Sequence, residues 1–216
     1  MAGFDADRGV GRWLLNIVAP VSCVACGDHG AHVCPACAQA LRAASALRRR
    51  AWAGGPTVWA LGAYDRSLRQ AVLNLKFRGR RPAARVLGVI LGRKLPLGGD
   101  ALVPVPIDAH RLKQRGYNQT DAIAAGIAAA LGKPTLDGAL CRKRDRPAQS
   151  SLRLPERRRN AVAAFAAGSN VGAVSGKQIW LVDDVVTSGA TAAACTAVLQ
   201  RNGALSVRVA ALAIKA

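Results

Sequence analysis

Long apolar runs are missing from this chain of 216 residues. No stretch approaches the ~18 consecutive apolar residues of a transmembrane helix, so no membrane-spanning segment is predicted. Residues 13–21 come nearest, but Asn16 and Pro20 interrupt them, and no small-residue cleavage pattern precedes the cysteines that follow. We therefore expect a short amphipathic helix there rather than a signal peptide, and a cytoplasmic protein.

Aromatic residues are also scarce, at 4% of the chain, although 51% of its residues are hydrophobic. This composition predicts a core of alanine, leucine and valine that is large enough to fold unaided. The length suits one medium-sized domain, or one domain with a small additional module.

Acidic residues are the third scarce class. The chain has 12 Asp and Glu against 31 Lys and Arg, which gives a formal net charge of +19. Because net charge bears on partners rather than on fold, this excess points to a polyanion: nucleic acid, a pyrophosphate-bearing substrate or an anionic membrane. An arginine-rich composition that leaves many side chains solvated would give the same charge.

Two of the few acidic residues, Asp183 and Asp184, are adjacent and follow the apolar run 179–182. A continuous apolar run this short predicts a strand buried on both faces, as in a parallel sheet. Residues 187–191 then lead into an alanine-rich helix. In open α/β sheets, ligands bind beyond the carboxyl ends of the strands, and a helix N-terminus attracts phosphate. A sugar phosphate fits this pattern; a strand end with two solvated aspartates and an ordinary helix cap is the alternative.

Four cysteines near the N-terminus have the spacing C-x₂-C-x₇-C-x₂-C. Two such C-x₂-C turns can present four thiolates to one Zn²⁺, which predicts a closed, structural zinc site. The predicted ligands are Cys23, Cys26, Cys34 and Cys37. Paired disulfides, a redox pair and an iron–sulfur cluster are the alternatives, and His29 or His32 could replace one thiolate.

Apolar segments alternate with helical patterns after the break at residues 54–56, which predicts an α/β domain over residues 54–216. Residues 1–53 would form the zinc module, with a helix from residue 38 that ends in the basic linker 48–50. The expected strands are 58–64, 101–106, 135–141, 179–182 and 204–214. The ligand cleft should lie at the carboxyl ends of the strands near residues 106, 141 and 184.

Basic residues gather in the segments that follow the expected strands. Arg111, Lys113 and Arg115 could neutralise a pyrophosphate, and the basic segment 142–160 looks like a loop over a site. The candidate nucleic-acid contacts are Lys76, Arg78, Arg80, Arg81, Arg142, Lys143 and Arg144. Solvated helix ends and wet loops are the alternative for each of these residues.

Taken together, the motifs resemble the ComF family of competence-associated, phosphoribosyltransferase-like proteins. They are the four-cysteine module, residues 76–79, residues 103–106 with 115–119, residues 149–152 with Arg157 and Asn160, and the acid pair. The resemblance covers nearly the whole chain. It implies a Rossmann-like type I phosphoribosyltransferase fold behind a small zinc-ribbon-like module.

The resemblance also implies roles for particular residues. The acid pair would hold the ribose hydroxyls of phosphoribosyl pyrophosphate (PRPP), which binds with Mg²⁺, and the following loop would hold its 5′-phosphate. This loop is Thr187, Ser188, Gly189, Ala190 and Thr191. Residues 107–118, with Arg111 and Lys113, would form the pyrophosphate loop, and residues 143–160 the flexible catalytic loop. The catalytic residues would be Asp183, Asp184, Arg115 and Arg146.

The resemblance implies a protein of DNA uptake in natural transformation that binds single-stranded DNA and PRPP, with competence-machinery proteins as further partners. The intact acid pair is equally compatible with an active phosphoribosyltransferase that acts on a nitrogen nucleophile. A zinc-stabilised scaffold for partner proteins is the third interpretation. The sequence shows no readable base pocket, N-terminal cysteine nucleophile or amidotransferase domain, so we do not expect a complete glutamine-dependent amidophosphoribosyltransferase.

Overall fold

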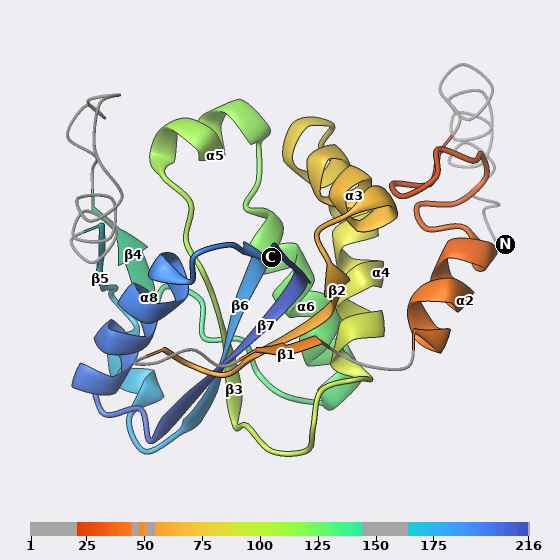
Figure 1. Ribbon diagram of the computed structural model, residues 1–216. Coiled ribbons are helices and arrows are strands. Elements are labelled where there is room, and N and C mark those ends of the chain that lie inside the picture. The colour runs from red at the N-terminus through yellow and green to blue at the C-terminus, as the bar shows by residue number, and fades with distance from the viewer. Residues whose placement is uncertain (1–20, 45–47, 51–54, 144–163, 216) are drawn as a thin grey trace, which may run out of the picture.

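A mainly parallel five-stranded sheet forms the centre of the computed structural model, which describes residues 21–44, 48–50, 55–143 and 164–215 (Figure 1). The strand order is β1-β2-β7-β6-β3; all pairs are parallel except β1–β2 at one edge. The strands are β1 (Arg48–Arg50), β2 (Val58–Ala63), β3 (Ala101–Pro104), β6 (Gln178–Val186) and β7 (Ser206–Ile214). This architecture confirms the predicted α/β fold with a mainly parallel sheet.

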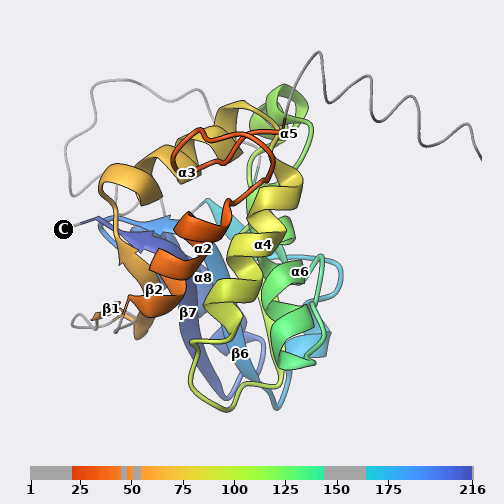
Figure 2. The same cartoon turned by 90° about the vertical axis from the view of Figure 1, so that its right-hand side faces the viewer.

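Helices cover both faces of this sheet (Figures 1 and 2). The helices are α2 (Pro35–Ala43), α3 (Arg66–Phe77), α4 (Arg81–Gly92), α5 (Ala109–Arg115), α6 (Gln119–Leu131) and α8 (Ala190–Arg201), with a 3₁₀ turn η1 (Val171–Val174). Trp180 and Val182 of β6 pack with α3, α4 and α6, whereas Ile179 and Leu181 pack with α8. Because residues 179–182 of β6 are buried on both faces of the sheet, this stretch is continuously apolar.

The N-terminal cysteine module joins the layer of α3, α4 and α6. Buried Asn74 of α3 donates a hydrogen bond to the carbonyl oxygen of Val24 at 2.7 Å, and Arg80 donates to the Ser22 hydroxyl at 2.9 Å. The ammonium of Lys94 donates to the carbonyl oxygen of Arg42 at 2.8 Å. The module is thus anchored to α3 and to both ends of α4.

Helices α4 and α6 approach closely because glycines face each other at their contact. A Cβ atom at Gly126 would overlap the backbone oxygen of Arg85, and one at Gly88 would overlap the backbone oxygen of Ile123. These overlaps involve backbone atoms, which no side-chain rotation can relieve.

Gly126→Ala should therefore destabilise the protein by about 2–3 kcal/mol, in the range of core overpacking. Urea denaturation measures this loss. Gly172→Ala is the matched control, because a Cβ at Gly172 meets nothing within 4 Å, and it should leave the unfolding midpoint nearly unchanged. Equal midpoints for the two variants would contradict the proposed glycine contact.

Three sequence predictions about individual elements were wrong. The strand expected over residues 135–141 is not part of the main sheet: residues 140–142 form strand β4 (Leu140–Arg142), which pairs antiparallel with β5 (Phe165–Ala167) in a separate two-stranded sheet. Thr135 makes only one bridge to β3. Residues 48–50, expected in a linker, form the edge strand β1, because the backbone of β2 offers an unpaired edge there. The helix expected from residue 38 to residue 53 ends at Ala43.

Candidate functional site

The acid pair lies within strand β6, which continues to Val186, rather than just beyond the strand. Asp183 pairs in register with Ala211 of β7, so the ladder continues past the carboxylates. Because side chains alternate along a strand, Asp183 and Asp184 point to opposite faces of the sheet. Asp184 is buried on the face of α3 and α6, at 5% exposure, whereas Asp183 is half-buried on the face of α8.

Asp184 is the centre of a polar network that joins three elements. Its Oδ2 atom lies 3.1 Å from the ammonium of Lys76 on α3, and it accepts a hydrogen bond of 2.7 Å from the amide of Gln119 on α6. The Oε1 atom of Gln119 in turn accepts a hydrogen bond of 3.2 Å from the guanidinium of Arg115. A charged neighbour and a neutral donor together compensate the buried carboxylate for its lost hydration.

Among the described residues, no cation forms an ion pair with Asp183 like the one that Lys76 forms with Asp184. Burial, together with the neighbouring charge of Asp184, raises the pKa of Asp183 to about 7. Its Oδ1 atom accepts a hydrogen bond of 2.8 Å from the backbone N–H of Asp184, which acts against this rise in pKa. On the same face, burial and the charge of Asp183 raise the pKa of the Cys195 thiol above its usual range.

The turn after β6 leads directly into the N-terminus of α8. Thr187 and Ser188 are exposed, and Gly189 takes the left-handed conformation with φ of 74°. The first helical bond runs from the N–H of Ala193 to the oxygen of Gly189, so the preceding amides of the first turn have no acceptor within the helix. A left-handed residue at this position favours glycine, and the exposed hydroxyls beside it provide further donors.

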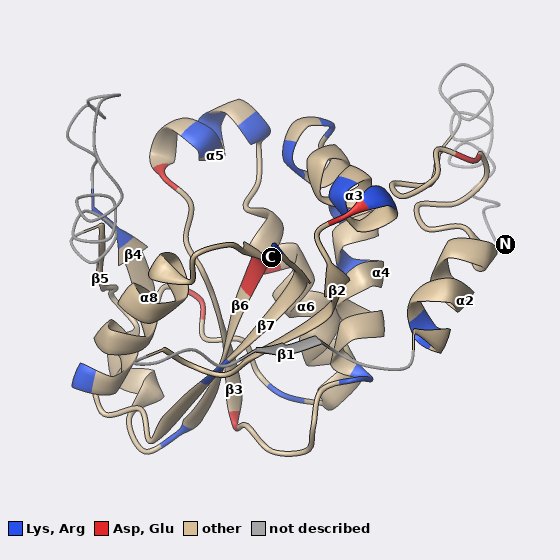
Figure 3. Cartoon of the chain, viewed as in Figure 1, with Lys and Arg blue, Asp and Glu red and all other residues tan. Residues whose placement is uncertain are grey.

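Basic residues surround the carboxyl edge of the sheet above the acid pair (Figure 3). We call them the basic rim; they are Arg78, Arg81, Arg111, Lys113 and Arg115. Arg111 and Lys113 are exposed on α5. Asp108 caps the N-terminus of this helix, and its carboxylate accepts a hydrogen bond of 2.8 Å from the N–H of Arg111. Arg115, at the end of α5, lies over the ring of Phe77 with its guanidinium carbon 5.6 Å from the ring centroid. Burial and the charge of Arg111 lower the pKa of Arg115.

A cavity of about 320 Å³ lies beside the end of β3, next to this rim. Pro104, Pro106, Leu112 and Leu140 line its apolar part, and its polar lining includes Asp121. Burial and the nearby charge of Asp137 raise the pKa of Asp121. The cavity is therefore close to the pyrophosphate loop expected from the sequence, but on the outer side of β3.

The four cysteines predicted as metal ligands come together in the N-terminal module. Their sulfur atoms all lie within 4.8 Å of one another, and the Cys26 and Cys34 sulfurs are 3.6 Å apart. Tetrahedral zinc–thiolate geometry, with bonds of about 2.3 Å, places sulfurs about 3.8 Å apart. The Cys23 sulfur accepts a hydrogen bond of 3.3 Å from the backbone N–H of Cys34, an interaction that favours a thiolate. The cluster thus fits a tetrahedral metal ion.

Comparison with known proteins places the chain in a family. No protein-family model matches it. DNA utilization protein YhgH of Salmonella typhimurium is 31% identical over 198 residues, which cover 87% of this chain and 81% of the relative. The chain belongs to the ComF family. Competence protein F of Haemophilus influenzae is 32% identical over 120 residues, and this match spans 56% of the chain and about half, 51%, of that relative.

Among solved structures, this ComF-family chain is similar to the glutamine PRPP amidotransferase from B. subtilis complexed with ADP and GMP. The identity is 22%, the TM-score is 0.44, and the match covers 61% of this chain and 26% of that one.

The structure brings only some of the sequence-predicted site residues of this ComF-family protein together. The acid pair, residues 187–191 and Arg115 meet at the carboxyl edge of the sheet. The exposed Arg111 forms an ion pair with Asp108 at 3.2 Å. Arg144 and Arg146 lie outside the described residues. None of the helices within the described ranges combines the length and apolar character that a membrane crossing needs.

The seven nucleic-acid candidates differ in their environment. Lys76 is engaged by Asp184, and Arg80 by the Ser22 hydroxyl. Arg142 is half-buried over the ring of Phe165, 5.5 Å from its centroid. The exposed candidates in the described part of the chain are Arg78, Arg81 and Lys143.

Two residues of the site were missing from the predicted site residues. Gln119 contacts Asp184 directly, although its sequence position indicates only the start of a helix. Phe77 is 68% exposed beside Arg115. Both belong to the motifs that carry the family resemblance, at residues 76–79 and 115–119, and this was the available signal. Their spatial role depends on contacts between distant segments.

Proposed function

We propose that this ComF-family protein binds the ribose phosphate part of PRPP at the carboxyl end of β6 and acts in the cytoplasm on single-stranded DNA during DNA uptake. The observation that carries the proposal is the placement of Asp184. This carboxylate is buried at the ligand edge of a parallel sheet, joined to Lys76 and Gln119, and followed by a helix N-terminus. The names of the relatives, competence protein F and DNA utilization protein YhgH, support the biological role.

The residues of the site would divide the ligand among them. Asp183 and Asp184 would accept hydrogen bonds from the ribose hydroxyls. At Asp184, a ribose hydroxyl would take the place that the ammonium of Lys76 has in the ion pair. Residues 187–191 would donate backbone and hydroxyl hydrogens to the 5′-phosphate. Arg111 and Lys113, both exposed on α5, would approach the pyrophosphate. Bound Mg²⁺ would supply neutralising charge to the pyrophosphate oxygens.

Calorimetric titration of PRPP with Mg²⁺ tests this site. We expect the wild-type protein to bind and Asp183→Asn to bind at least about tenfold more weakly, since a hydrogen bond to a charged group contributes ~1.5–3 kcal/mol. Asp65→Asn is the matched control, because Asp65 is exposed and makes no capping hydrogen bond. No binding by folded wild-type protein would overturn the PRPP proposal. If Asp183→Asn bound PRPP as tightly as the wild type, the proposed role of Asp183 in binding the ribose would be wrong.

Single-stranded DNA would cross the basic rim, where exposed Arg78 and Arg81 follow the end of α3. Counterion release should make this binding weaken steeply with salt. Replacing both arginines with glutamine should reduce the slope of log K against log salt by about two, one for each lost phosphate contact. Fluorescence anisotropy with a labelled oligonucleotide measures the slope.

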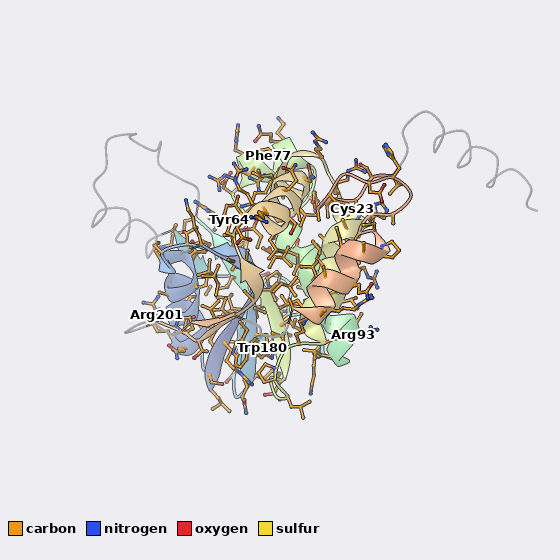
Figure 4. All side chains as sticks on the ribbon, turned by 45° about the vertical axis from the view of Figure 1, so that its right-hand side comes forward. Cys23, Tyr64, Phe77, Arg93, Trp180 and Arg201 are labelled. Atoms are coloured by element: carbon orange, nitrogen blue, oxygen red, sulfur yellow. The ribbon has the colours of Figure 1, made fainter. Side chains whose placement is uncertain are left out.

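The control for the rim variant replaces Arg93 and Arg201, which are exposed and lie away from the rim (Figure 4). It removes the same charge from the molecule, so it should leave the slope nearly unchanged. Equal slopes for the two double variants would show that net charge alone, and not the rim, binds DNA.

An active phosphoribosyltransferase is the second candidate function, favoured by the ionic network around Asp184, which pure DNA binding does not require. Such an enzyme stabilises a cationic ribosyl centre and a departing pyrophosphate, so positioning would account for most of its catalysis. Pyrophosphate release that depends on an added nitrogen nucleophile and is abolished by Asp184→Asn would support it. No release with any base would leave PRPP as a bound ligand only.

We also propose that the ion of the cysteine cluster is Zn²⁺ in a structural role. Four thiolates fill its coordination shell and leave no open position for a substrate. Metal analysis of the purified protein, with Cys34→Ser as the depleted comparison, should give one zinc per chain; iron in its place would overturn this assignment.

A further inference from the structure

Phe77 is an exposed aromatic residue, whereas most large apolar side chains in the described part of the chain are buried. It is 68% exposed at the end of α3, and among the large exposed hydrophobic residues in the described ranges it is the only aromatic one. The others are Val86, Leu97, Leu112 and Leu205. Removing a phenylalanine side chain from water is favourable, so an exposed ring forgoes stability that burial would provide. Figure 4 shows Phe77 at the same end of the molecule as the basic rim.

The surroundings of Phe77 connect it with the acid pair. The guanidinium of Arg115 lies over the Phe77 ring and also donates a hydrogen bond to Gln119, which in turn donates to Asp184. Lys76, the neighbour of Phe77 in the chain, forms the ion pair with Asp184. The aromatic ring is therefore separated from the buried carboxylate by only two side chains along one route and by one residue along the other.

Arg115 holds the ring without enclosing it. Its distance of 5.6 Å from the ring centroid is near the outer limit of a cation–π contact, and its buried Nε atom has no hydrogen-bond acceptor among the described residues. A buried donor of this kind calls for a specific explanation, and an acceptor atom of a ligand would provide one. A planar heterocycle has both features that this pair can recognise: a π-face for the ring and lone pairs for the guanidinium.

We propose that Phe77 and Arg115 form a stacking site for a nucleobase, next to the ribose site at Asp184. The inference extends the proposed function, on which it rests, because it names the chemical group that the rim recognises beyond phosphate. Exposed Arg78 and Arg81 lie one and four positions after Phe77 in the chain, and they supply the charge that a phosphodiester backbone requires. A base stacked on Phe77 would have its sugar and phosphate beside these arginines.

The base can come from a single-stranded nucleic acid or from a free purine or pyrimidine. Two oligonucleotides of equal length and equal phosphate number separate base recognition from charge: one carries thymine at every position, and the other is abasic. Anisotropy titrations of both, at one salt concentration, give the ratio of their affinities. Adenine, added with PRPP and Mg²⁺ and followed by calorimetry, represents the free base.

In the wild-type protein we expect the base-bearing strand to bind about tenfold more tightly than the abasic strand, since stacking of one base contributes ~1–3 kcal/mol. Phe77→Leu should abolish this ratio, and Phe77→Trp should preserve it. Leu205→Ala is the matched control: Leu205 is 69% exposed, in the turn between α8 and β7, and its loss should change nothing. Melting temperatures of all variants verify that each is folded.

The outcomes distinguish this inference from the proposed function. If neither oligonucleotide binds, the DNA-binding proposal fails; the stacking site then stands only if adenine binds with PRPP and Phe77→Leu abolishes that binding. If both bind equally in wild-type protein and adenine does not bind, the stacking site is wrong and DNA binding remains. A base-dependent ratio that survives Phe77→Leu overturns the role of Phe77.

Discussion

Removal of the metal from the four-cysteine cluster should unfold residues 21–44 and leave the α/β domain folded. The module has few buried apolar residues of its own, and without the ion its four sulfur atoms, all within 4.8 Å of one another, lose the metal bonds that would hold them together. The expected loss of local stability is about 5 kcal/mol or more, since structural zinc contributes ~10–16 kcal/mol in zinc-finger peptides. Hydrogen exchange with mass spectrometry, before and after chelation, measures the lost protection.

Cys34→Ser should reproduce the effect of the chelator, whereas Cys141→Ser should not. Cys141 is an exposed cysteine on β4, outside the cluster, and its sulfur donates to the oxygen of Ala167. The α/β domain provides the internal reference, because strand β6 is buried on both faces. Full protection of residues 21–44 after complete loss of the ion would contradict a structural metal.

Asp183→Asn should stabilise the protein above neutral pH while it weakens the binding of PRPP. The pKa of Asp183 rises from 3.8 to about 7 on folding. Between these values the folded state holds more protons than the unfolded state, so the wild-type free energy of unfolding falls as the pH rises through this window. Above pH ~7 the Asp183 side chain is ionised in the folded protein, and its destabilising effect is then complete. Asparagine at this position carries no charge, but it keeps the oxygen that accepts the hydrogen bond from the N–H of Asp184.

The expected gain of Asp183→Asn over wild type is roughly 1.5 kcal/mol larger near pH 8 than near pH 5. Each pKa unit corresponds to ~1.4 kcal/mol, and solvent at the half-buried side chain reduces the full linkage value. Urea denaturation of the variant and the wild type at both pH values measures this gain. Because the two proteins are compared at the same pH, the pH dependence of all other groups cancels. Asp65→Asn should show no such difference. A gain independent of pH would show that Asp183 is ionised with an ordinary pKa in the folded protein.

The sequence predicts those elements whose burial or ligand spacing produces a clear pattern of residue types. Residues 179–182 are continuously apolar because β6 is covered on both faces, and the spacing of the four cysteines alone indicates one metal site. The edge strand β1 has no such pattern: three arginines pair there because β2 leaves an edge open. Helix α5 was missed for the same reason, since it buries no residue and begins at the capping side chain of Asp108.

The site was predictable only at the level of its motifs. The acid pair, the turn at residues 187–191 and the basic segments each stand out in the sequence. The ion pair of Lys76 with Asp184, by contrast, joins two motifs that are far apart in the chain, and it exists only because α3 packs beside β6. The end of β6 was misplaced because pairing with β7 extends the strand through two charged residues.

Two side chains of helix α3, only two residues apart, contact the cysteine module and the acid pair. Asn74 binds the carbonyl oxygen of Val24, the neighbour of Cys23, and Lys76 binds Asp184. A shift of α3 therefore alters the contact with the cysteine module and the contact with the acid pair together. If the two sites are coupled in this way, the effect of metal binding on PRPP binding must equal the effect of PRPP binding on metal binding. If emptying the cysteine cluster weakens the binding of PRPP by some factor, PRPP must tighten the hold of the cluster on its ion by the same factor.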